Sequence, residues 1–138
     1  MCTARPRRSA EQILQHLGLV SYLDSIYGAE EDGRFEDKAE LLGLLLTREQ
    51  VSPQCAVMVG DRASDIAAAT VHGVRAIAAS WGYGTREEVA ASGALAVCDD
   101  PGDLVFMIRR MGAGSREHHD RSRASATHRY VDVGGQAR

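Results

Sequence analysis

One stretch constrains the fold more than any other. The apolar run Ala56–Val59 stops at Gly60 and is followed by two carboxylates, Asp61 and Asp65. A short apolar run of this kind is typical of a strand buried on both faces of a parallel sheet, and a glycine lets the chain turn sharply off its end. Ligands of open parallel sheets bind beyond the carboxyl ends of strands, where two carboxylates suit Mg²⁺. The same two residues are equally suited to capping the next helix and turning the chain.

Predicted helices and strands alternate along the rest of the chain. Helices are predicted over residues 9–17, 37–47, 65–72, 85–92 and from 100–101 onward. Strands are predicted within 22–28 and over 56–60, 74–79 and 95–98, and residues 1–6 are interpreted as the last residues of a strand followed by a turn. Ser9 with Gln12, and Thr85 with Glu88, fit capping boxes at two of the helix starts. For the first helix we expect a buried stripe made of Ile13, Leu14 and Leu17. This alternation predicts a parallel α/β sheet flanked by helices.

Composition limits the classes of partner. A length of 138 residues, 44% of them hydrophobic, is enough for one domain. The formal net charge of −3 gives no excess of positive charge of the kind that binds nucleic acid. No apolar stretch is long enough to cross a bilayer, and the basic N-terminus lacks the apolar segment of a signal peptide. The three cysteines show no metal-binding spacing, so we expect reduced thiols and a cytoplasmic location. The only lysine is Lys38, among 15 arginines.

The sequence changes character at Gly112. Residues 112–138 are rich in Gly, Ser, Arg and His, with almost no apolar content before Tyr130. Such a segment buries too little apolar surface to offset its ordering entropy, so residues 1–111 are predicted to form the core and residues 112–138 a disordered tail. A metal site at His118, His119 and His128 is the alternative to a solvated tail, but no second set of ligands accompanies them.

Five stretches, in order, resemble the C-terminal part of haloacid dehalogenase-like hydrolases of the phosphoglycolate phosphatase-like branch. They are Cys2-Thr3-Ala4-Arg5-Pro6, Ile26-Tyr27-Gly28 with Asp32-Gly33, Asp37 to Leu42, Val57 to Arg62 with Asp65-Ile66, and Trp81-Gly82-Tyr83-Gly84. The resemblance implies a Rossmann-like parallel sheet and hydrolysis of a small phosphorylated metabolite through an aspartyl phosphate, with Mg²⁺ bound. It makes Thr3 a hydrogen-bond donor to the phosphoryl group, Lys38 the cation that neutralises its charge, and Asp61 and Asp65 the acids of the Mg²⁺ site.

Each of these residues also has an ordinary structural interpretation. Thr3 can serve as a strand-end or capping hydroxyl, and Lys38 as a solvated residue in the first turn of a helix. Arg5 and Arg62 are interpreted as surface or loop-anchoring charges. Trp81 and Tyr83 are interpreted as packing beneath their loop.

The family's nucleophile motif, Asp-x-Asp-x-Thr, does not occur in this sequence, and neither does the helical cap that follows it. The nearest echo is Tyr130 to Gly135, which has valine where an acid is needed. We therefore expect a parallel sheet without its central strand and no efficient turnover by this chain alone. Met1 lies almost immediately before the Thr3 motif, which suggests a truncated reading frame, a mis-assigned start or half of a split gene.

Three functional hypotheses remain open. The first is a Mg²⁺-dependent phosphomonoester phosphatase that keeps its phosphate and metal groups but lacks the nucleophile. The second is a non-catalytic binding module or half-domain completed by a partner chain, since an open sheet edge recruits a strand. The third is a truncated fragment without a cooperative fold.

Overall fold

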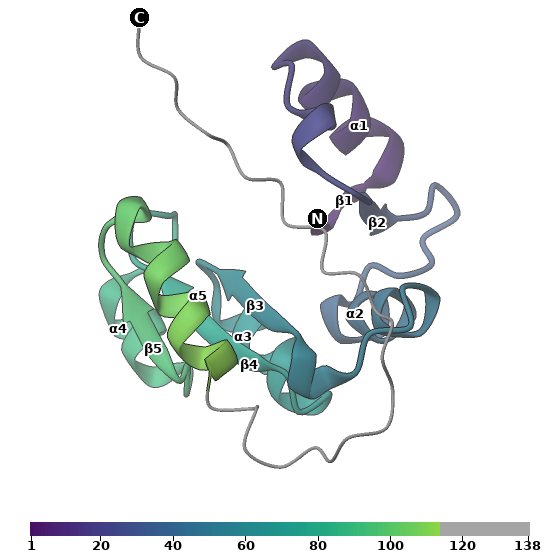
Figure 1. Ribbon diagram of the computed structural model, residues 1–138. Helices are drawn as coiled ribbons and strands as arrows, with labels where there is room; N and C mark the ends of the chain where they lie inside the picture. The colour runs from purple at the N-terminus through teal and green to yellow at the C-terminus, as the bar shows by residue number, and fades with distance from the viewer. Residues whose placement is uncertain (114–138) are drawn as a thin grey trace, which may run out of the picture.

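The computed structural model describes residues 1–113, in which strands and helices alternate (Figure 1). The strands are β1 (Cys2–Pro6), β2 (Tyr27–Ala29), β3 (Val57–Gly60), β4 (Arg75–Ala79) and β5 (Ala96–Cys98). The helices are α1 (Arg7–His16), α2 (Lys38–Arg48), α3 (Ala63–Val71), α4 (Arg86–Ala91) and α5 (Leu104–Ala113). Short 3-10 turns cover Val20–Tyr22, Pro53–Cys55 and Pro101–Asp103. The alternating α/β pattern predicted from the sequence is confirmed.

The strands form two parallel sheets. In the first, β1 pairs with β2, and Cys2 lies opposite Tyr27. In the second, the order is β3-β4-β5, with Val57 opposite Arg75 and Ile77 opposite Ala96. Within residues 1–113, no ladder joins β1 to β3. The break between the sheets agrees with the expectation that the central strand is missing from this chain.

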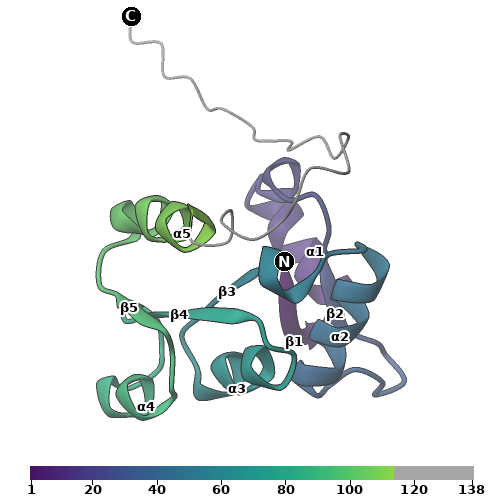
Figure 2. The same cartoon turned by 60° about the horizontal axis from the view of Figure 1, so that its bottom comes forward.

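Helices lie on both sides of these strands. Figure 2 shows α3 and α4 on one side of the three-stranded sheet and α5 on the other, while α1 and α2 flank the two-stranded sheet. The core lies where α2 and α3 meet β4. Its buried residues are Leu42, Leu46, Ile66, Ala68, Ala69, Val74, Ala76 and Ala78. The alanines of α3 and β4 allow close packing of the helix on the sheet.

The first helix differs from its prediction. It begins at Arg7, directly after Pro6, and no side chain caps it, so the capping box proposed for Ser9 and Gln12 is wrong. Only Ala10 is buried in α1, whereas Ile13 is 46% and Leu17 60% exposed. The predicted buried stripe is therefore wrong for Ile13 and Leu17, and Leu14 is only half-buried.

Strand β3 also differs from its prediction. All four residues of β3 are half-buried, whereas the sequence predicts a strand buried on both faces. The reason is the sheet order: β3 is an edge strand of the described sheet, so one of its long sides is not covered by a neighbour.

The last described helix extends past the predicted core boundary. Helix α5 ends at Ala113, so regular structure continues two residues past 111. Arg75 holds α5 against the sheet, because its guanidinium donates to the carbonyl of Met111 and, at 2.7 Å, to that of Gln54.

The predicted disordered tail beyond Ala113, the three tail histidines and the echo at residues 130–135 lie outside the described residues. Within residues 1–113 no helix has the length and apolar character needed to cross a membrane.

Candidate functional site

Lys38 and Asp65 form the centre of the candidate site. Lys38 is the first residue of α2, and Asp65 lies in the first turn of α3. The Lys38 Nζ atom is 2.9 Å from Asp65 Oδ1, and the two side chains are only 15% and 10% exposed. Lys38 Nζ also donates to the main-chain carbonyl of Cys2 at 3.2 Å. One buried ion pair therefore links α2, α3 and β1, and so spans the break between the two sheets.

Local sequence directs Lys38 into this position. The carboxylate of Asp37 accepts hydrogen bonds from the main-chain N–H groups of Ala39 at 2.8 Å and Glu40 at 2.9 Å. This is an N-cap, and it fixes the start of α2 at Lys38. The low exposure of the Lys38 side chain excludes the alternative interpretation of a solvated first-turn lysine.

The end of β3 holds Asp65 closely. Its Oδ2 atom accepts a hydrogen bond from the main-chain N–H of Arg62 at 3.2 Å. A Cβ atom placed on Gly60 would lie 2.3 Å from the Asp65 Cβ, so the carboxylate occupies the space that any larger residue at 60 would need. Gly60 is thus required for close approach of Asp65 as well as for the turn.

Asp61 faces a different neighbour. Its Oδ2 atom accepts a hydrogen bond from the main-chain N–H of Tyr83 at 2.7 Å. A Cβ atom on Gly82 would lie 2.2 Å from the Asp61 Cβ, so the glycine of the Trp81–Gly84 loop is needed for this contact. Asp61 therefore anchors that loop over the carboxyl end of β3. Tyr83 is 88% exposed, which overturns the prediction that its ring packs beneath the loop.

Glu88 is a residue of this region that sequence reasoning assigned only to helix capping. The predicted capping box is half confirmed, because the Glu88 N–H donates to Thr85 Oγ1 at 3.0 Å. The Glu88 carboxylate, however, accepts from the main-chain N–H of Ala63 at 3.0 Å and lies 3.9 Å from Arg62 Nη1. It thereby ties the turn after β3 to α4. Nothing in the local sequence signals this long-range contact.

Thr3 directly follows the residue whose main-chain carbonyl binds Lys38. Its Oγ1 atom accepts a hydrogen bond from the N–H of Arg5 at 3.3 Å, and the residue before it, Cys2, provides the carbonyl that binds Lys38. Of the four predicted site residues, Lys38 and Asp65 are in direct contact. Thr3 directly follows Cys2, whose carbonyl binds Lys38, and Asp61 lies four residues before Asp65 in the chain. The roles assigned to all four stay predictions.

The environment of Lys38 also affects Cys2. Burial raises the pKa of the Cys2 thiol above its ordinary value, while the Lys38 ammonium acts in the opposite direction and is the weaker influence. Cys2 is therefore held as a neutral thiol beside the ion pair.

The donor set is compatible with Mg²⁺. Mg²⁺ binds proteins through one or two carboxylates and keeps several waters. Asp61 and Asp65 supply two carboxylates beyond the end of β3, and only one oxygen of Asp61 takes part in the hydrogen bond to the Tyr83 N–H. In the described part of the chain no group of three or more His, Cys, Asp or Glu residues is placed to hold a metal. A site with few protein ligands fits these residues, and one enclosed by protein ligands does not.

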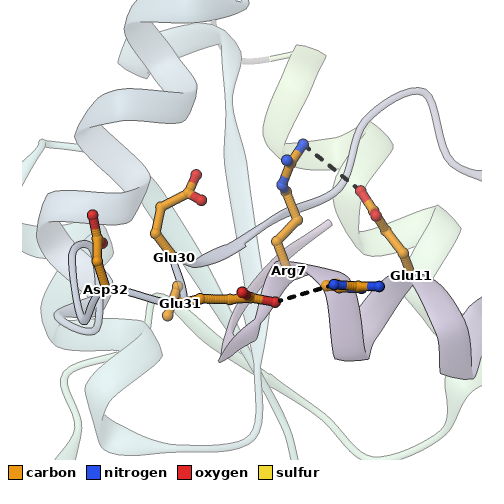
Figure 3. Close-up of a pocket in the computed structure, with 7 residues that line it drawn as sticks. Arg7, Glu11, Glu30, Glu31 and Asp32 are labelled. Carbon is orange, nitrogen blue, oxygen red and sulfur yellow. Dashed lines mark ion pairs between the residues drawn. The ribbon is translucent and has the colours of Figure 1, made fainter.

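A separate surface cavity lies away from the candidate site. It has a volume of about 480 Å³ and lies at the end of β2, and none of the four predicted site residues lines it. Figure 3 shows side chains that line it. Its charged lining residues are Arg7, Arg8, Glu11, Glu30, Glu31 and Asp32. Arg7 pairs with Glu11 and Arg8 with Glu31, each at 3.8 Å, so carboxylates outnumber guanidiniums and both guanidiniums are engaged. This cavity is unsuited to a phosphate.

Comparisons with known proteins show what this chain is similar to. A family model for haloacid dehalogenase-like hydrolases matches residues 1–73. The chain is 37% identical over 100 residues to phosphoglycolate phosphatase of Rhodospirillum rubrum, covering 72% of this chain and 41% of that protein. It is 33% identical over 87 residues to the tyrosine-protein kinase PtkA of Mycobacterium tuberculosis, covering 63% of this chain and 30% of that protein.

The fold is shared with a crystal structure of a predicted phosphatase from Clostridium acetobutylicum. The TM-score is 0.76 at 28% identity, over 79% of this chain and 50% of that one. The chain thus spans about half of that structure and less than half of the two curated relatives. Because the family model covers more than half of its residues, the chain belongs to the haloacid dehalogenase-like hydrolase family.

Proposed function

We propose that this chain provides the magnesium- and phosphate-binding groups of a phosphomonoester hydrolase site. The observation that carries the proposal is the buried Lys38–Asp65 pair, which places a fixed ammonium and a carboxylate at the carboxyl end of β3. A developing or bound phosphate is stabilised by fixed cations and hydrogen-bond donors in such a position. The relatives' names include a phosphatase and a kinase, both of which handle phosphoryl groups.

Each residue has one role in this proposal. Asp61 and Asp65 hold Mg²⁺, which supplies positive charge to the oxygens of the phosphoryl group when it is bound. Lys38 binds the same group through its ammonium, and Thr3 donates a hydrogen bond from its hydroxyl. The ligand class is a small phosphorylated metabolite, with phosphoglycolate as the first candidate because of the Rhodospirillum rubrum relative.

We further propose that the chain alone does not turn over such a ligand. No Asp-x-Asp-x-Thr motif occurs in its sequence, and a missing covalent nucleophile cannot be replaced by better positioning. The chain is therefore expected to bind Mg²⁺ and phosphate weakly and to hydrolyse a phosphomonoester at a negligible rate.

Trp81 provides the readout for a binding test. It is the only tryptophan and belongs to the loop whose Tyr83 N–H is bound by Asp61, so a cation on Asp61 is expected to change its fluorescence. Titration with MgCl₂ should give a saturable change that inorganic phosphate enhances. Asp61→Asn should abolish it, whereas Asp103→Asn, which removes the same charge from an exposed site at the start of α5, should not. An equal response of both variants would contradict the proposed metal site.

Hydrolysis of p-nitrophenyl phosphate tests the second part. With Mg²⁺ present, the purified chain and its Asp61→Asn variant should release p-nitrophenol at the same background rate. Turnover well above background that Asp61→Asn removes would overturn the proposed inactivity while supporting the metal site.

A further inference from the structure

Helix α3 begins without a local cap. Its N-cap position is Arg62, and a guanidinium has only hydrogen-bond donors, so this side chain cannot accept from the first N–H groups of the helix. Ser, Thr, Asp and Asn are the residues that usually serve at this position. The first of these N–H groups, that of Ala63, donates instead to the Glu88 carboxylate of α4 at 3.0 Å. A residue 25 positions away therefore completes the start of α3.

This helix start is also the turn between the two predicted magnesium ligands, Asp61 and Asp65. Two successive N–H groups of the turn have carboxylate acceptors: Arg62 donates to Asp65 Oδ2 at 3.2 Å and Ala63 to Glu88 Oε1 at 3.0 Å. The first bond uses an oxygen of a predicted ligand. The second takes its acceptor from another helix, so it holds the turn without engaging either predicted ligand.

A second hydrogen bond between the same two segments runs in the opposite direction. Asp61 Oδ2 accepts from the main-chain N–H of Tyr83 at 2.7 Å. The main-chain N–H of Glu88 donates to Thr85 Oγ1 at 3.0 Å, which fixes Glu88 in the first turn of α4. The turn after β3 and the segment from Tyr83 to Glu88 are thus joined by two carboxylate–amide bonds, one donated from each side.

We propose that Glu88 is a positioning residue for the magnesium site, an inference that rests on the proposed function. Its bond to the Ala63 N–H fixes the turn, and thereby the directions in which the Asp61 and Asp65 carboxylates point. Residues that orient metal ligands without binding the metal contribute to metal affinity in this way.

The hydrogen bond, and not the charge of Glu88, carries this role. The ion pair of Glu88 with Arg62 is long, at 3.9 Å, and the Arg62 side chain is 53% exposed. Exposed ion pairs of this kind contribute little. Glutamine at position 88 keeps an oxygen that can accept from the Ala63 N–H, whereas alanine does not. The two substitutions therefore separate the hydrogen bond from the charge.

Amide exchange of Ala63 tests the bond without Mg²⁺ or phosphate. As the first N–H group of α3, it has no acceptor within the helix, so its protection depends on Glu88. In the wild-type chain it should exchange about tenfold more slowly than in an unfolded peptide. Glu88→Ala should remove this protection, and Glu88→Gln should keep it. An Ala63 amide that exchanges at the unfolded rate in the wild type would overturn the inference.

Magnesium titrations of the folded chain test the effect on the site. The readout is the MgCl₂ concentration at the midpoint of the Trp81 fluorescence change. Glu88→Ala should raise it about tenfold, and Glu88→Gln should leave it within about threefold. Glu87→Ala removes the same charge from the neighbouring, exposed position of α4 and should leave the midpoint unchanged. A merely structural role of Glu88 would lower the melting temperature without moving the midpoint of the folded protein.

The outcomes distinguish this inference from the proposed function. Equal midpoints for Glu88→Ala and Glu87→Ala, with a normal wild-type response, would overturn the inference and leave the metal site standing. Equal losses in Glu88→Ala and Glu88→Gln would assign the effect to charge and also overturn it. A wild-type chain without any Mg²⁺ response would contradict the proposed function, and the role of Glu88 with it. If Glu88→Ala does not fold, a tenfold loss in Glu88→Gln or an unprotected Ala63 amide in the wild type still overturns the inference.

Discussion

Lys38 shows why a lysine, and not an arginine, suits one position in this arginine-rich chain. Its Nζ atom has two partners from different elements, the Asp65 carboxylate at 2.9 Å and the Cys2 carbonyl at 3.2 Å. A compact ammonium satisfies single acceptors in different directions, whereas the planar guanidinium of arginine favours two parallel acceptors. Both members of the pair are largely buried, so each depends on the other for compensation of its charge.

Removing one charge of this pair is expected to destabilise the protein. Lys38→Met leaves the Asp65 carboxylate buried without its cation and should lower the free energy of unfolding by about 3 kcal/mol. The double variant Lys38→Met/Asp65→Asn removes both charges and should recover part of that loss. Urea denaturation of the wild type, both single variants and the double variant measures the coupling. If the loss in the double variant equalled the sum of the losses in the two single variants, the interaction between Lys38 and Asp65 would contribute nothing to stability.

The three cysteines are expected to react at different rates. Burial raises the pKa of Cys2, so less of it is thiolate at a given pH, while Cys55 is exposed and Cys98 is buried. Iodoacetamide at pH 8 should therefore modify Cys55 first, Cys2 more slowly and Cys98 last. Mass spectrometry of timed samples gives the order, and the unfolded chain in urea, where the three rates should converge, is the control. Fastest labelling at Cys2 would contradict the effect of burial.

At the scale of elements, α2 is the helix that relates the two sheets. Its first residue contacts β1 and α3 through Lys38, and its buried residues Leu42 and Leu46 belong to the core shared with α3 and β4. The Asp37 cap fixes where α2 begins, and therefore where Lys38 lies. The sequence predicted this helix from Asp37 to about Thr47, and the structure confirms it within one residue.

Loss of the α2 cap should have a measurable effect on stability. Asp37→Ala removes the acceptor of two main-chain N–H groups and should cost about 1 kcal/mol. For a domain of this size the melting temperature should fall by about 5 °C in calorimetry. Asp24→Ala, at an exposed loop position outside the helix termini, is the control and should have a smaller effect. An equal fall in both variants would argue that the cap does not stabilise α2.

At the scale of the whole molecule, the two parallel sheets differ in how completely their strands are paired. Strand β4 lies between β3 and β5 and contains the fully buried Ile77, whereas β3 has one neighbour among the described strands. Stability against local opening should follow this order, because amides in a doubly paired, buried strand are released only by larger unfolding events.

Hydrogen exchange of the free chain should reproduce that order. Residues 75–79 of β4 are expected to exchange more slowly than residues 57–60 of β3, and both more slowly than the exposed loop at residues 81–84. Peptide-resolved mass spectrometry of the free chain gives the comparison. Equal protection of β3 and β4 would mean that the free edge of β3 is already covered in solution.

The sequence alone was enough for the helix–strand alternation, the parallel sheets, the extent of α2 and the family. Each depends on short-range signals: an apolar run that ends at Gly60, the apolar pattern of the helix that begins near Asp37, and motifs in order along the chain. The exposure of Ile13 and Leu17 on α1 could not be predicted in this way, because an amphipathic pattern shows which face is apolar but not whether another element covers it.

Only the tertiary structure decided how the candidate site is connected. Lys38 and Asp65 are 27 positions apart, and their 2.9 Å contact exists because α2 and α3 pack side by side. The Asp61 contact with the loop at Tyr83 and the apolar cavity lined by α2 and β3 likewise depend on elements that meet only after folding. Local sequence determines which elements form, because propensity and capping act over a few residues. Packing determines which side chains meet, because distant segments share no local signal.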